Sequence, residues 1–127
     1  MGRSQPRPTD TELAILRVLW ELGPSTVRQV HEALAETRDT GYTTTLKLMQ
    51  IMADKGLVTR DETARTHIYA AHAGQEQTQS QLVKDLVDRA FGGSAAALVL
   101  RALSADDATD AELKEIRKMI DDYREKR

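Results

Sequence analysis

The order of secondary structure in the first 72 residues constrains the fold of this chain most strongly. Apolar residues recur there at the spacing of an amphipathic helix in three successive stretches. Two shorter runs rich in β-branched residues follow, separated by a few polar residues, which is typical of a hairpin. The expected helices are 10–22, 26–36 and about 42–55, and the expected strands lie in 57–63 and 66–71. Helix, helix, helix, hairpin is the order of a winged helix-turn-helix domain, which we expect over residues 9–72.

Start and stop signals support these boundaries. A Thr followed three residues later by Glu or Gln forms a capping box, in which two side chains satisfy backbone N–H groups that the helix leaves free. Glycine ends a helix because it accepts the left-handed backbone conformation there. Capping-box spacing occurs at Thr9 and Glu12, Thr26 and Gln29, and Thr109 and Glu112, and glycine stops occur at Gly23, Gly56 and Gly92. The apolar positions expected to face the core of this domain are Leu13, Leu16, Leu19, Trp20, Val27, Val30, Leu34, Leu46, Met49, Met52 and Ala53.

Residues 73–127 have a different pattern, with three further helices. The middle one, 94–103, is apolar on almost every face, and the last presents apolar residues at near-heptad spacing. Three helices in about 55 residues bury this much apolar surface poorly by themselves. We therefore expect a helical dimerisation module, in a mainly α chain with a small β-hairpin, since two-fold homodimers are the commonest assembly. The residues expected at the dimer contact are Leu82, Leu86, Phe91, Leu98, Leu100, Leu113, Ile116, Ile120 and Tyr123.

Composition excludes several classes of chemistry. The chain has no cysteine, which rules out disulfides and thiolate metal sites, and no apolar run is long enough to cross a membrane. His31 and Glu32 resemble the start of the zinc motif H-E-x-x-H, but the second ligand position holds Ala35. Without a nucleophile or a ligand cluster we expect no enzymatic activity, no metal and no cofactor. Residues 1–8 are expected to form a flexible arm without the apolar stretch of a secretory signal, which favours a cytoplasmic protein.

The third expected helix carries the polar groups that nucleic acid accepts. Hydroxyl, amide and ammonium groups bind base edges and phosphates, although polar residues on one helix taken alone are also typical of a solvated face. In the hairpin, Arg60 and Arg65 flank an acidic tip and either contact phosphates or form surface ion pairs. Arg3 and Arg7 of the arm add candidate backbone or minor-groove contacts. The outer face of the third helix is expected to consist of Thr44, Thr45, Lys47, Leu48, Gln50, Ile51 and Asp54.

Four segments together resemble the penicillinase repressor family, which includes methicillin-resistance and copper-responsive repressors. They are Thr9–Trp20, Tyr42–Leu46, Lys55–Val58 and Ala64–Tyr69, and the resemblance extends over residues 8–125. It implies a homodimer bound to a palindromic double-stranded DNA operator. Many relatives have Arg where this chain has Ile51 and Gly where it has Ala64, so the family's base preference and wing geometry are not carried over to these two positions. The contact residues that the resemblance implies are Thr43, Thr44, Lys47 and Gln50 on the recognition helix and Arg65 on the wing.

The resemblance also implies a means of release. In antibiotic-responsive members of this family, a membrane sensor metallopeptidase system leads to cleavage inside the dimerisation module. The corresponding region here is 98–102, where the Asn-Phe type bond of those relatives is absent, and our hypothesis is cleavage between Arg101 and Ala102. Copper-sensing relatives carry a cysteine motif near the C-terminus, and its absence argues against copper sensing.

The sequence thus predicts a homodimeric, sequence-specific DNA-binding repressor. The net charge of −2 is not that of a strongly basic protein, so this prediction depends on the order of elements and on the third helix. The alternative is a winged-helix protein-interaction module without specific DNA binding, because a fold does not by itself determine a function. Binding to the DNA upstream of the chain's own gene discriminates between the two.

Overall fold

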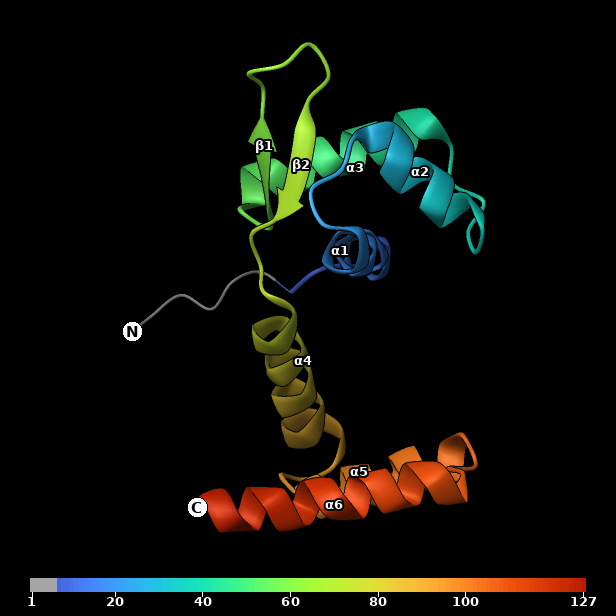
Figure 1. Ribbon diagram of the computed structural model, residues 1–127, viewed down its shortest axis with the longest axis vertical. Coiled ribbons are helices and arrows are strands. Elements are labelled where there is room, and N and C mark those ends of the chain that lie inside the picture. Colours follow the sequence, from blue (N-terminus) through green and yellow to red (C-terminus); the bar gives the residue numbers. More distant parts are fainter. Residues whose placement is uncertain (1–6) are drawn as a thin grey trace. The chain divides into compact units, whose positions relative to one another are not determined.

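The computed structural model describes residues 7–127 and divides the chain into two compact units that meet after Leu82. Within the described range the elements follow the expected order (Figure 1). They are α1 (Asp10–Leu22), α2 (Val27–Ala35), α3 (Tyr42–Lys55), β1 (Val58–Asp61), β2 (Ile68–Ala71), α4 (Gln75–Ala90), α5 (Ala95–Ala105) and α6 (Asp110–Lys126). The mainly helical chain with a small hairpin confirms the predicted fold class. Arg3 of the predicted arm lies outside the described residues.

The first unit has its hydrophobic core between α1, α2, α3 and the hairpin. Strands β1 and β2 are antiparallel, with Val58 opposite Ala71. Ser25, in the connection between α1 and α2, forms a bridge to β2: its N–H donates to the carbonyl of Tyr69 and the Tyr69 N–H donates back, both at 2.8 Å. The hairpin is therefore held to the helical part by backbone hydrogen bonds as well as by packing. The buried core residues are Ile15, Leu16, Leu19, Val27, Val30, Leu34, Met49, Met52, Leu57, Val58, Tyr69 and Ala73.

Helix caps lie where the sequence predicts them. The Thr9 and Thr26 boxes form on both sides, with side chain and backbone bonded reciprocally. At Thr109 the hydroxyl oxygen accepts from the N–H of Glu112 at 3.1 Å. Gly56 ends α3 with a φ of 82°, a left-handed conformation that side-chain-bearing residues rarely adopt. These local signals account for the close agreement between predicted and observed helix limits.

The inner face of α3 differs from the prediction. Thr45 is fully buried together with Met49 and Met52, whereas Leu46 is half-buried. Positions i, i+4 and i+7 lie on one side of a helix, so these three residues form a single stripe toward the core. The prediction chose Leu46 because it is apolar, and the structure confirms Met49 and Met52 but places Thr45 rather than Leu46 at the buried centre of the first turn.

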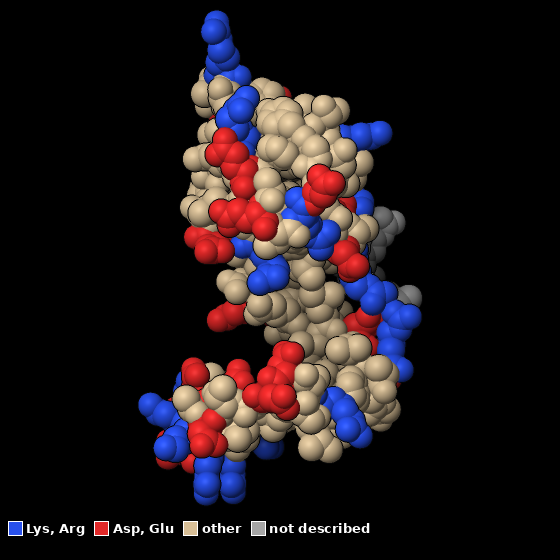
Figure 2. Space-filling model, turned by 90° about the vertical axis from the view of Figure 1, so that its right-hand side faces the viewer, with Lys and Arg blue, Asp and Glu red and all other residues tan. Residues whose placement is uncertain are grey.

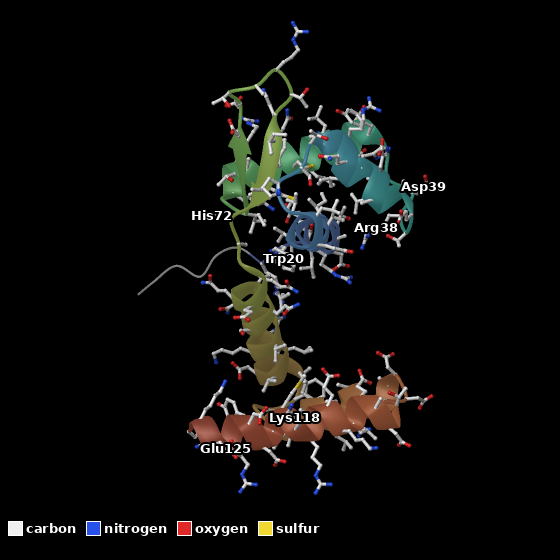
Figure 3. The ribbon with its side chains drawn as sticks, in the orientation of Figure 1. Trp20, Arg38, Asp39, His72, Lys118 and Glu125 are labelled. Carbon is white, nitrogen blue, oxygen red and sulfur yellow. The ribbon has the colours of Figure 1, made fainter. Side chains whose placement is uncertain are left out.

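The boundary between the units lies within α4, after Leu82, rather than after His72, where the sequence places it. Ala73 is buried in the core of the first unit, and its carbonyl accepts from the indole N–H of Trp20 at 2.9 Å (Figure 3). Gln75, in the first turn of α4, borders the same surface hollow as Trp20. The start of α4 is therefore grouped with the first unit, to which the preceding Ala73 is bonded.

The second unit consists of the C-terminal part of α4 together with α5 and α6. No described residue of these three helices is buried within a single chain. The sequence shows α5 to be apolar on almost every face, and within one chain Leu100 of this helix is 58% exposed. Along the described residues no helix has both the length and the apolar character needed to cross a membrane.

Candidate functional site

Four polar residues share one exposed side of α3. They lie in the N-terminal and central turns of the helix, at spacings of one, three and three residues, which places them along one side of the helix. Gly41 precedes the helix and provides no side-chain cap, so the first backbone N–H groups of α3 are open to solvent or to a ligand. All four are exposed, as the sequence predicts: Thr43, Thr44, Lys47 and Gln50.

Two other predicted contact residues of α3 do not lie on this surface. Thr45 is 0% exposed, and its hydroxyl donates to the carbonyl of Gly41 at 3.1 Å. Leu48 is half-buried and packs against the core of the first unit. Thr45 is thus a core residue, and the prediction that it contacts a ligand is wrong. Ile51, which replaces the Arg of many relatives, is also half-buried.

The two arginines of the hairpin differ in their ion pairing. The Nε of Arg60 lies 3.5 Å from Oε1 of Glu62, and hydrogen bonding to Tyr69 together with the Glu62 charge raises the pKa of Arg60. Arg65, in the loop between the strands, is exposed and has no ion pair among the described residues. Basic side chains project beyond the first unit at its hairpin end (Figure 2). The two alternatives that the sequence leaves open are therefore both present, an ion pair at Arg60 and a free guanidinium at Arg65.

Asp61, at the acidic tip of the hairpin, stabilises the turn by hydrogen bonds. Oδ1 of Asp61 accepts from the backbone N–H of Thr63 at 2.9 Å and from its hydroxyl at 2.7 Å. These bonds lower the pKa of Asp61, so the carboxylate stays ionised while it shapes the loop. Glu62 also lies 3.9 Å from Nε2 of His67, which pairs with it when the imidazole is protonated.

An ion pair between a buried carboxylate and a lysine whose side chain is 35% exposed connects α1 with the end of α3, and sequence reasoning missed it. Glu12 is 1% exposed, and its Oε2 lies 2.9 Å from Nζ of Lys55 in the last turn of α3. Its Oε1 accepts from the backbone N–H of Thr9 at 2.9 Å. Burial raises the pKa of Glu12, but the Thr9 and Lys55 bonds outweigh it and hold the pKa below 4.5. The sequence identified Glu12 as a cap, but no local signal pairs it with a residue 43 positions away.

An aromatic contact at the start of α3 was also missed. The ring of Tyr42, the first residue of α3, lies edge-on to His31 of α2 with centroids 5.7 Å apart. The guanidinium of Arg28, in the first turn of α2, lies over the same ring at 5.7 Å. Cation–π contact orients such a guanidinium without neutralising it. Arg28 therefore stands beside the exposed start of α3 as a further positive charge.

The predicted dimerisation residues are partly exposed in a single chain. The most exposed are Tyr123 at 67%, Leu100 at 58% and Ile120 at 52%. Leu82, Phe91, Leu98 and Ile116 are half-buried, and Leu86 and Leu113 are exposed. Full burial of a large apolar side chain stabilises a protein by about 1.5 to 3 kcal/mol relative to leaving that side chain in water.

The remaining predicted site residues lie in simple surroundings. Arg101 and Ala102 are exposed and lie inside α5, so the bond between them is helical. Arg7 is exposed at the start of the described residues. Across the described residues, no group of three or more His, Asp or Glu side chains is arranged to hold a metal ion.

Comparison with known proteins gives consistent results. A family model described as Penicillinase repressor matches residues 8–122. The "Transcriptional regulator BlaI" of Mycobacterium tuberculosis is 39% identical over 104 residues, covering 78% of this chain and 75% of that protein. The "Penicillinase repressor" of Bacillus licheniformis is 18% identical over 122 residues, covering 96% of this chain and 95% of that protein.

One solved structure resembles the fold. It is the solution structure of the Bacillus licheniformis BlaI monomeric form in complex with the blaP half-operator, with a TM-score of 0.51 and 19% identity. The match covers 58% of this chain and 90% of that chain. The likeness agrees with the winged helix predicted from the order of elements.

Proposed function

Because the chain belongs to the penicillinase repressor family, we propose that it is a sequence-specific transcriptional repressor. It binds a palindromic double-stranded DNA operator as a homodimer in the cytoplasm and blocks transcription by occupying the promoter, without catalysis. The observation that carries this proposal is the exposed polar face of α3, formed by Thr43, Thr44, Lys47 and Gln50. The Bacillus licheniformis relative was solved with an operator half-site, which supports DNA as the partner.

In this proposal α3 is the recognition helix and lies in the major groove. Thr44 reads base edges through its hydroxyl and methyl groups, and Gln50 reads adenine through its amide. Lys47 and Arg65 bind phosphates, which position the protein without reading sequence. Arg65 is suited to this role because no carboxylate neutralises it in the described part of the chain.

The second unit is proposed to hold two copies together. Its exposed apolar residues on α5 and α6, among them Leu100 and Ile120, need a cover that a single chain does not provide. A second copy supplies an identical surface and the two-fold symmetry of a palindromic operator. Each α3 then enters one half-site, with the half-sites about one DNA turn apart.

Release is proposed to follow cleavage between Arg101 and Ala102, with a membrane sensor metallopeptidase system as the trigger. Both residues are exposed, but a helical bond must unwind before it fits a peptidase site. Cleavage is therefore expected to be slow in the folded dimer. Incubation with the activated cognate peptidase tests this step: release of DNA from a chain that stays intact contradicts it.

The DNA-binding proposal is tested by fluorescence anisotropy with two duplexes of equal length. One contains the DNA upstream of the chain's own gene and the other the same bases in scrambled order. We expect tighter binding to the first duplex and, for about 6 to 10 phosphate contacts, a fall in affinity of about 10³ to 10⁵ between about 50 and about 200 mM salt. Equal affinity for both duplexes with a flat salt response contradicts the proposal and favours a protein-interaction module.

A further inference from the structure

Two flexible side chains lie at the centre of the contact between α3 and the core, with Leu46, Leu48 and Ala53 half-buried around them. These fully buried apolar anchors are Met49 and Met52. Methionine is unbranched and flexible, so it fills space without strongly specifying one orientation of the element that carries it. A recognition helix, however, must place its side chains within hydrogen-bond distances of base edges, about 2.7 to 3.2 Å.

The Glu12–Lys55 ion pair adds a polar contact in the last turn of the same helix, three residues beyond Met52. Glu12 is 1% exposed, so water cannot readily replace Lys55 as the partner of its Oε2 at 2.9 Å. An exposed pair such as Lys84 and Asp88, at 3.1 Å, opens and closes easily in comparison. The second oxygen of Glu12 accepts from the backbone N–H of Thr9 in the cap of α1, so the carboxylate is itself held in one position on α1.

We propose that Glu12 and Lys55 are positioning residues that set the angle at which α3 presents Thr44 and Gln50, and thereby the discrimination between operator and other DNA. This inference rests on the proposed function. Thr44 lies eight residues before the buried Met52, or roughly 12 Å along the helix at 1.5 Å per residue. A tilt of about 10° about Met52, which the Glu12–Lys55 pair on the other side of Met52 opposes, moves Thr44 by roughly 2 Å, most of the length of a hydrogen bond.

The positive charge of Lys55 is also paired within the protein. Its ammonium is bonded to Glu12 and stabilises the negative C-terminal end of α3. It therefore contributes to DNA binding through the position of the helix rather than through a phosphate. This separates Lys55 from Lys47, which is exposed and has no ion pair among the described residues.

The test compares Lys55→Met with Lys84→Met, a control that breaks an exposed pair of the same chemistry. The ratio of affinities for the upstream duplex and the scrambled duplex is measured at several salt concentrations. We expect Lys55→Met to lower this ratio about tenfold with an unchanged salt slope, because each bidentate base contact that is lost reduces discrimination by about this much or more. Lys55→Arg should restore most of the ratio, and Lys84→Met should leave it at the wild-type value.

Every outcome of this comparison either supports or overturns the inference. A salt slope reduced by about one, with equal losses on both duplexes, assigns Lys55 to a phosphate and overturns the inference. A lower melting temperature with an unchanged ratio shows a merely structural pair and also overturns it. If Lys55→Met does not fold, the Glu12→Gln variant, which keeps an oxygen for the Thr9 N–H, is measured in the same way and must lower the ratio. A wild-type chain that fails to discriminate between the duplexes refutes the proposed function itself.

Discussion

Thr44 and Thr45 are neighbours in α3 with opposite surroundings. One helical step of 100° turns Thr44 to solvent and Thr45 into the core beside Met49. A hydroxyl is tolerated there because it donates to the carbonyl of Gly41. That carbonyl also accepts from the Thr45 backbone N–H at 3.0 Å, so it keeps a partner even without the hydroxyl.

Replacing each threonine by valine should separate the two roles. Thr45→Val is expected to change the free energy of unfolding by less than about 1 kcal/mol, since no acceptor is left without a partner, and to leave base preference unchanged. Thr44→Val should leave stability unchanged and alter base preference. Urea unfolding and anisotropy on duplexes with single base-pair changes measure both effects. A shift in base preference for Thr45→Val contradicts the assignment of this residue to the core.

Ionisation of Glu12 should make stability depend on pH in the acid range. Its pKa is lowered in the folded chain, so its contribution is present above the unfolded pKa, near 4.5, and is lost as the pH falls through the folded value. We expect the free energy of unfolding to fall between about pH 5 and pH 3, and to fall less in Glu12→Gln. Urea unfolding across this range measures the difference. Parallel pH profiles of the two proteins contradict the lowered pKa.

At the residue scale, the sequence predicts exposure better than it predicts partners. Thr43, Lys47 and Gln50 are exposed as expected, because helical periodicity separates the faces of α3. Thr45 was misplaced because polarity was taken as a sign of exposure. The pairing of Glu12 with Lys55 joins distant parts of the chain, and only the folded structure shows it.

At the scale of elements, the hairpin carries both basic and acidic side chains. Arg60 pairs with Glu62, Asp61 shapes the loop, and Arg65 remains unneutralised among the described residues. A carboxylate close to phosphates weakens binding to any DNA. If the hairpin lies along the DNA backbone as proposed, Glu62 is expected to limit its affinity for DNA of arbitrary sequence.

Glu62→Gln should raise affinity for every duplex. The substitution removes one negative charge and releases Arg60, so we expect a several-fold gain at low salt and a salt slope larger by up to about one. The ratio between upstream and scrambled duplexes should stay constant, because phosphates carry no sequence information. Anisotropy titrations on both duplexes measure these quantities. A selective loss on the upstream duplex would show instead that Glu62 accepts a hydrogen bond from a base.

Element limits are predictable here because the signals are local. The Thr9 and Thr26 caps and Gly56 act within one helical turn, and the predicted start and end of α1 match the observed Asp10–Leu22. The unit boundary was placed too early for the opposite reason. Composition changes after His72, but the Trp20 bond to Ala73 ties the following segment to the first unit.

At the scale of the whole molecule, the two units differ in how they are stabilised. The first has a buried core of its own, whereas the second has no buried residue in a single chain. Dimerisation and folding of the second unit are therefore expected to be coupled, since an uncovered apolar surface gives little stability. Periodicity alone predicted the apolar faces, but it cannot say which of them a second copy covers.

Ile120→Glu tests this coupling. Ile120 is 52% exposed on α6, and a charge there opposes burial against a second copy. We expect a monomer by analytical ultracentrifugation and an affinity for the full palindrome lower by about 100-fold or more, because linking two half-site contacts contributes about 10² to 10⁴. Affinity for a half-operator duplex should not change, since α3 and the hairpin belong to the other unit.

The matched control is Lys118→Glu, which places the same side chain two residues earlier, about 200° around α6 and so on its opposite side. It should remain a dimer with wild-type affinity for the palindrome. If the Ile120→Glu protein is still a dimer, Ile120 does not lie in the dimer contact. A monomeric Ile120→Glu protein that still binds the full palindrome like the wild type shows that one chain suffices for operator binding. Loss of half-operator binding in that variant indicates instead that the two units do not fold independently.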